Sequence, residues 1–150
     1  MNTLVFRFAA AMGWVSLSAY LLLAPASTFS KNGFFKRVLN HLGLKDLVQE
    51  LPIDKAIHFI IFWGLVFFWQ RVIVAWPQTV KKKQVWTLLN IMGWCMMGLA
   101  TEYMQGYMQL GRQFDYTDMI ANTAGCLLGG WLAKKLTPVE TGVATKTNCL

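Results

Sequence analysis

The sequence is poor in charge. Only 14% of its 150 residues are charged and just seven are acidic, whereas 55% are hydrophobic. A soluble domain is typically about 25% charged, because its surface has to stay hydrated. The composition therefore argues against an ordinary cytosolic enzyme, and the high apolar share excludes a disordered chain. The length suits one domain.

The sequence also lacks the short motifs that accompany common active sites. It contains no Gly-x-Ser-x-Gly nucleophile motif, no His-Glu-x-x-His zinc motif and no phosphate-binding loop. The three cysteines, Cys95, Cys126 and Cys149, have neither the spacing of a metal knuckle nor that of a disulfide framework. No cofactor is therefore predicted, and whether the protein is an enzyme stays open.

What the chain does have is four long apolar segments. They predict transmembrane helices near residues 4–24, 54–76, 85–105 and 115–136. About 20 helical residues cross a hydrocarbon core roughly 30 Å thick, and the polar alternation of membrane strands is missing. The predicted fold is therefore an all-α integral membrane protein, a four-transmembrane-helix bundle that forms a single membrane domain over residues 1–136.

Three other features concern the segments around these spans. The first span resembles a signal peptide ending near Ala24-Pro25-Ala26, but its length favours an uncleaved span. Residues 26–53 place apolar side chains at helical spacing among basic ones. They predict an amphipathic helix on the membrane surface, bent near Gly43, although a helix that caps the bundle would show the same pattern. Residues 137–150 predict a flexible polar tail.

The net charge of +7 is explained by topology. Lys81 to Lys83 lie between the second and third predicted spans, and Lys134 and Lys135 end the fourth. By the positive-inside rule these ends face the cytoplasm, so both termini are expected there. Membrane lipids are the expected partners of such basic clusters, and no nucleic-acid partner is expected.

Polar residues gather at three helix ends. The start of the second span, the end of the third and the start of the fourth carry Asp54, Lys55, His58, Glu102, Gln105, Arg112, Asp115, Asp118 and Asn122. Connectivity brings these ends to one side of the membrane, which is the outer side in the predicted orientation. Because ionisable groups at membrane depth are costly, we expect this cluster to bind a ligand or, alternatively, to join the spans through salt bridges and helix caps.

The same polar cluster contains possible ligands for a metal ion. Oxygen and imidazole donors of the right kind come from His58, Glu102, Asp115 and Asp118. The nearby cations Lys55 and Arg112, and the lack of closely spaced ligands, argue against an ion, so no metal site is predicted.

Two glycines on the fourth span predict a packing seam. Gly125 and Gly129 form a small-xxx-small pair, which allows two helices to approach closely. The seam would join helices within the bundle or the subunits of a homo-oligomer.

The polar motifs resemble those of a known family. They read Asp54-Lys55-x-x-His58-Phe59, then Glu102-x-x-Gln105, then Arg112-x-x-Asp115-x-x-Asp118-x-x-x-Asn122-x-x-Gly125. In type, order and spacing they closely resemble the VanZ-like family of small bacterial membrane proteins over about residues 52–130. The family pattern often has Pro-Gly-Arg before the fourth span, where this chain has Leu110-Gly111-Arg112.

This resemblance implies a protein of the bacterial inner membrane that is connected with the cell envelope. The family is named for a member linked to teicoplanin resistance, so antibiotic resistance is an implied role. The resemblance supplies no reaction.

Three functions fit these residues. The first is binding of an envelope lipid or a glycopeptide-like ligand, in which Arg112 clamps a phosphate or carboxylate, Lys55 adds a point charge and the carboxylates bind hydroxyl and amine groups. The second is an intramembrane enzyme acting on an envelope lipid or peptidoglycan precursor, with His58 or Glu102 as general base, oriented by Asp118. The third is a structural or transport component.

Overall fold

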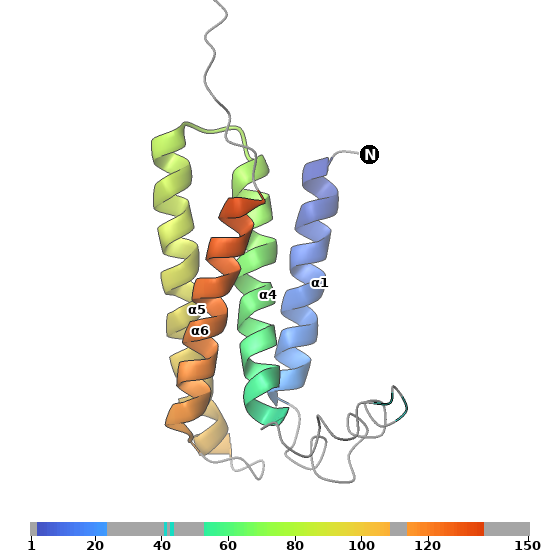
Figure 1. Cartoon of the computed structure of the whole chain (residues 1–150), viewed down its shortest axis with the longest axis vertical. Coiled ribbons are helices and arrows are strands. Elements are labelled where there is room, and N and C mark those ends of the chain that lie inside the picture. Colours follow the sequence, from blue (N-terminus) through green and yellow to red (C-terminus); the bar gives the residue numbers. More distant parts are fainter. Residues whose placement is uncertain (1–2, 24–40, 42, 44–52, 109–113, 137–150) are drawn as a thin grey trace, which may run out of the picture.

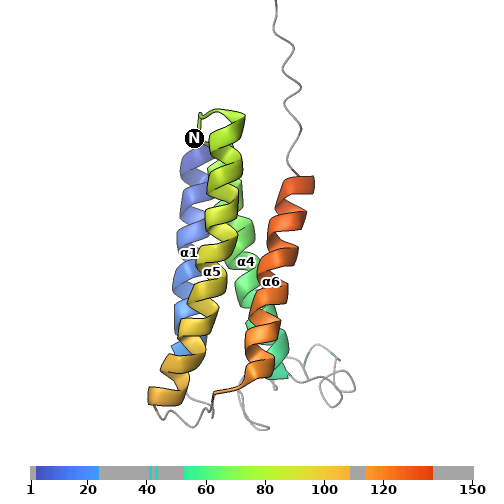
Figure 2. The ribbon, with the colours of Figure 1, turned by 90° about the vertical axis from the view of Figure 1, so that its left-hand side faces the viewer.

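The computed structural model describes residues 3–23, 41, 43, 53–108 and 114–136. Within these ranges the chain is helical and contains no strand. The helices are α1 (Thr3–Leu23), α4 (Ile53–Ala75), α5 (Val80–Met108) and α6 (Tyr116–Lys135). They run alternately up and down beside one another (Figure 1), and the same arrangement is seen from the side in Figure 2. The prediction of an all-helical protein is confirmed.

Two of the four helices, α1 and α4, are long and apolar enough to cross a membrane. The four-span arrangement therefore stays a prediction. Most of the predicted surface helix over residues 26–53, the tail over 137–150 and Arg112 lie outside the described residues. Gly43 is described, and its φ of 77° is a left-handed conformation that glycine adopts without strain.

The boundaries of α1, α4 and α6 lie within about two residues of the predicted spans, but α5 begins earlier than expected. Lys81 to Lys83 lie in its first turn rather than in a connection. The carbonyl of Thr79 accepts the first helical hydrogen bond, from the N–H of Lys83 at 3.0 Å. The helix therefore extends beyond the predicted span at residues 85–105, because charge predicts the edge of a membrane, whereas lysine continues a helix readily.

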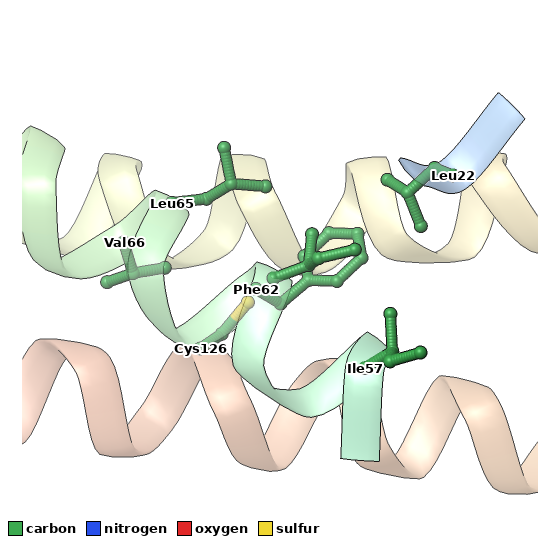
Figure 3. Packing of buried hydrophobic residues seen from close by; sticks show 7 residues of the cluster. Leu22, Ile57, Phe62, Leu65, Val66 and Cys126 are labelled. Atoms are coloured by element: carbon green, nitrogen blue, oxygen red, sulfur yellow. The ribbon is translucent and has the colours of Figure 1, made fainter. Parts of the chain in front are cut away.

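The core is centred on α4, which contacts the other three helices. Its buried residues Ile57, Ile61, Phe62, Leu65 and Val66 recur at helical spacing and pack with Leu22 of α1 and Cys126 of α6 (Figure 3). Because α4 is apolar around most of its circumference, it is the helix that the others cover.

Glycines set the closest helix contacts. A Cβ atom on Gly125 would lie 2.4 Å from the carbonyl oxygen of Phe59, and one on Gly129 would lie 2.5 Å from that of Trp63. The structure thus places this pair of α6 directly against the backbone of α4. On the other side of α4, Gly64 makes room for Trp14, whose indole N–H donates to the carbonyl of Ile61 at 3.0 Å.

Candidate functional site

Three helix ends meet at one end of the bundle, the lower end in Figure 1. They are the start of α4, the end of α5 and the start of α6, as connectivity predicts for an up-and-down bundle. The polar residues that they bring together form two layers. We call His58, Glu102 and Asn122 the inner network, and Lys55, Asp115, Thr117 and Asp118 the outer group.

The inner network is fully enclosed and joins three helices. His58 and Glu102 are 0% exposed and Asn122 is 1% exposed. The Nδ1 atom of His58 lies 3.0 Å from Oδ1 of Asn122 and 3.3 Å from Oε1 of Glu102. The amide of Asn122 donates to Oε1 of Glu102 at 3.4 Å and to the carbonyl of Gly98 at 3.5 Å.

These contacts indicate which nitrogen of the His58 ring carries the hydrogen. Both neighbours of Nδ1 are acceptors, so Nδ1 carries the hydrogen and donates it. The other ring nitrogen, Nε2, is buried and has no hydrogen-bond partner among the described residues, and the same holds for Oε2 of Glu102. Buried polar atoms normally have partners, so these two are candidates for contact with a ligand. The buried Oγ of Ser18 and Nε1 of Trp69 also lack partners among the described residues.

The outer group surrounds the amine of Lys55. Its Nζ donates to Oδ2 of Asp115 at 2.7 Å, to Oδ1 of Asp118 at 3.1 Å and to the hydroxyl of Thr117. The side chains of Lys55 and Asp115 are 34% and 43% exposed, whereas that of Asp118 is 6% exposed. The outer group therefore lies between the buried network and the surroundings of the protein.

Asp115 has two structural roles. It is the N-cap of α6, where its side chain accepts from the backbone N–H of Thr117 at 2.8 Å. The hydrogen bond from Lys55, followed by those from Thr117, holds the pKa of Asp115 well below its usual range. Its carboxylate is thus kept ionised beside the amine.

The other predicted site residues lie in different places. Gln105 is buried, but its amide donates to the carbonyl of Leu22 at 2.9 Å and so ties α5 to α1 instead of joining the inner network. Asp54 is exposed at the start of α4. The role predicted for Asp118, orienting His58, is taken by Glu102 and Asn122, since Asp118 contacts Lys55.

The structure adds two residues that the sequence did not point to. Thr117 binds both Lys55 and Asp115, and a hydroxyl on the first turn of a helix is too common to be noticed in a sequence. Gly98 leaves room for Asn122, because a Cβ atom there would lie 3.0 Å from the Cβ of Asn122. A single glycine in an apolar helix gives no warning of this contact.

One set of side chains has the donors and spacing to hold a metal ion. A ring nitrogen of His58 and carboxylate oxygens of Asp54 and Asp118 all lie within 4.8 Å of one another. This set includes Asp54 in place of the Glu102 and Asp115 that the sequence had suggested.

A model of the VanZ/LLP1 family matches residues 3–137. No curated protein and no solved structure matches the chain. The family match covers all four helices together with the inner network and the outer group, and it agrees with the resemblance seen in the polar motifs. The chain belongs to the VanZ/LLP1 family.

Proposed function

We propose that the chain is a four-span protein of the bacterial inner membrane with both termini in the cytoplasm. Family membership and the two apolar helices indicate a membrane protein. The remaining two helices support spans of their own, because they expose large apolar side chains such as Leu88, Met96, Ile120 and Leu127. The basic residues at the start of α5 and the end of α6 favour this orientation, in which the site faces outward.

The site would then bind the polar head of an envelope component. The observation that carries this proposal is the partly exposed outer group above a buried network with two unpartnered polar atoms. Intramembrane ionisable groups usually serve a ligand or a pathway, because burying them opposes insertion and stability.

Charge indicates which head group suits this site. Asp115 and Asp118 outnumber Lys55 in the outer group, so its side chains favour hydroxyl and amine groups over a bare phosphate. A glycolipid or a glycopeptide-like molecule has such groups. The phosphate clamp by Arg112 stays a sequence prediction.

Binding by the purified protein in lipid nanodiscs tests this function, with teicoplanin and a lipid-linked sugar as probes. Asp115→Asn removes the charge but keeps an equally good N-cap, so α6 should still form. We expect this variant and Lys55→Met to weaken binding about tenfold, the worth of a charged hydrogen bond. Gln70→Met, far from the site, is the control. Equal affinity in all four proteins would refute ligand binding at the outer group.

A contribution to teicoplanin resistance would follow from such binding. A sensitive bacterium that expresses the wild-type chain should then tolerate more teicoplanin than one that expresses Asp115→Asn at the same level. Equal susceptibility of the two strains would separate this chain from resistance while leaving ligand binding to the nanodisc measurement.

The His58 ring supports a second candidate, an enzyme that modifies an envelope lipid or a peptidoglycan precursor. Its Nδ1 is held by an amide and a carboxylate while Nε2 is unpartnered, which is the arrangement of an oriented general base. Turnover of a lipid-linked precursor by the protein in nanodiscs is the test. His58→Gln should abolish turnover and spare binding, and turnover that survives the substitution would exclude this role.

A further inference from the structure

Asp54, His58 and Asp118 form a three-point donor set at the open end of the bundle. Asp54 and His58 are one turn apart on α4, and Asp118 lies in the first turn of α6, which packs closely on α4. Their donor atoms lie within 4.8 Å of one another. Around a tetrahedral zinc ion, with ligand distances near 2.1 Å, donor atoms are about 3.4 Å apart. The donor atoms are thus spread by at most about 1.4 Å more than around a bound zinc ion.

The state of His58 provides independent support. Metal-bound histidines almost always donate their second N–H to a carboxylate or carbonyl, which fixes the tautomer and turns the other nitrogen toward the metal. His58 has this arrangement already, because Nδ1 faces Glu102 and Asn122 while the buried Nε2 has no partner among the described residues. An unpartnered ring nitrogen in a fully buried side chain is otherwise unfavourable.

Lys55 does not oppose a cation as strongly as its charge suggests. Its amine is bound by Asp115 at 2.7 Å and reaches only one carboxylate oxygen of Asp118, at 3.1 Å. Asp115 therefore compensates much of the positive charge of Lys55, and the carboxylates of Asp54 and Asp118 lie beside His58. The sequence does not show how Lys55 is paired with these carboxylates, and for that reason it argued against a metal ion.

We infer that Asp54, His58 and Asp118 bind a divalent transition-metal ion, with Glu102 and Asn122 as positioning residues that hold the His58 ring. A mixed imidazole and carboxylate set suits Zn²⁺, Mn²⁺ or Fe²⁺ better than Mg²⁺ or Ca²⁺, which prefer oxygen ligands alone. Three protein ligands leave a coordination position open for a water molecule or a ligand group. The metal site lies where the proposed ligand binds, and it deepens the proposed function.

Titration of the detergent-solubilised protein with Zn²⁺, after removal of metals by a chelator, tests the site. We expect one Zn²⁺ to bind per chain and Mg²⁺ not to compete. Asp54→Asn and Asp118→Asn should each weaken Zn²⁺ binding at least about tenfold, and Glu102→Gln about 10- to 100-fold, as for other residues that orient a metal ligand. Gln70→Met, which lies far from the site, is the control and should leave the Zn²⁺ affinity unchanged.

Bound Co²⁺ provides a second readout, its visible spectrum, which a substitution at a residue that only supports the fold would leave unchanged. Its visible absorption reports the ligand field, so the wild-type protein should give bands that change with Asp54→Asn and persist in Gln70→Met. The metal site is refuted if the wild-type chain binds no Zn²⁺, or if Asp54→Asn and Asp118→Asn, folded by circular dichroism, bind it as well as the wild type does. Absence of Zn²⁺ binding to the wild-type chain, with intact binding of teicoplanin or lipid-linked sugar, would overturn the metal site alone, and the reverse result would overturn the ligand alone.

Discussion

The bundle contains two polar layers, one fully buried and one partly buried, and they differ in chemistry. The inner network near the start of α4 is built from a histidine and a glutamate with one amide, and two of its atoms lack partners among the described residues. The layer two to three turns farther along α4 consists of neutral side chains. Gln70 donates to the hydroxyl of Thr87 at 2.6 Å and accepts from Asn90 at 3.3 Å.

The neutral layer satisfies its own hydrogen bonds. Thr87 also donates to the carbonyl of Lys83 at 2.8 Å, and Asn90 to that of Val66 at 3.1 Å. Such a layer holds two helices together and needs nothing else. The inner network buries two ionisable side chains and leaves two of its atoms without partners among the described residues, which is why we propose a functional site there.

The two layers also connect different helices. The inner network joins α4 to α6 and α5 through His58, Asn122 and Glu102, whereas Gln70 and Thr87 join only α4 to α5. Changes at the contact between α4 and α6 should therefore separate the two layers experimentally.

The largest effect is expected from Gly125→Ala. The new Cβ would meet the carbonyl of Phe59 at 2.4 Å and the amide nitrogen of Trp63 at 3.0 Å, and backbone atoms move only if the helices part. We expect the free energy of unfolding in mixed micelles to fall by about 3 kcal/mol, at the upper end of overpacking. Hydrogen exchange should rise near His58 more than near Gln70.

Gly93→Ala is the control for this change. No atom lies within 4 Å of a Cβ at Gly93, and alanine favours a helix by about 1 kcal/mol, so stability should stay the same or increase. Equal destabilisation by the two substitutions would mean that the close contact of α4 with α6 is not what holds the inner network together.

A matched pair of methionine substitutions compares the layers directly. Gln70→Met removes two hydrogen bonds and should lower the free energy of unfolding by about 1–2 kcal/mol. Glu102→Met removes a fully buried carboxylate that has an unpartnered oxygen, and the relief of burying this charge offsets the lost contacts with His58 and Asn122. Stability should therefore fall by less than it does in Gln70→Met, while Zn²⁺ binding weakens about 10- to 100-fold. A reversed order of stabilities would make the inner network the structural layer.

The smallest effect concerns pH and the outer group. Because Lys55 and Thr117 hold the pKa of Asp115 below its ordinary value of 3.8, the ionised carboxylate contributes stability above about pH 4 and loses it as the pH falls further. Asp115→Asn lacks this contribution. The difference in melting temperature between wild type and variant should thus shrink from pH 6 to pH 3. A difference that stays constant would show that Lys55 does not stabilise the ionised form.

Much of the fold was predictable because it depends on periodicity and composition. Long apolar segments predicted four helices, and three of them lie where expected. Helix α5 begins before the predicted span, since Lys81 to Lys83, which were expected in a connection, continue the helix. Connectivity alone decided which predicted site residues gather at one end of the bundle. They are Asp54, Lys55, His58, Asp115, Asp118 and Asn122, with Glu102 beside them.

The sequence by itself thus determined the helices, the family and the end of the bundle at which polar side chains collect, since all three follow from local pattern and chain order. Only the tertiary structure decided which side chains meet. The rotation of α6 against α4, set by glycines that admit backbone contact, pairs Asn122 with His58 and Asp118 with Lys55, and it sends Gln105 to α1. Helix rotation depends on packing between distant segments, so neither spacing nor composition specifies it.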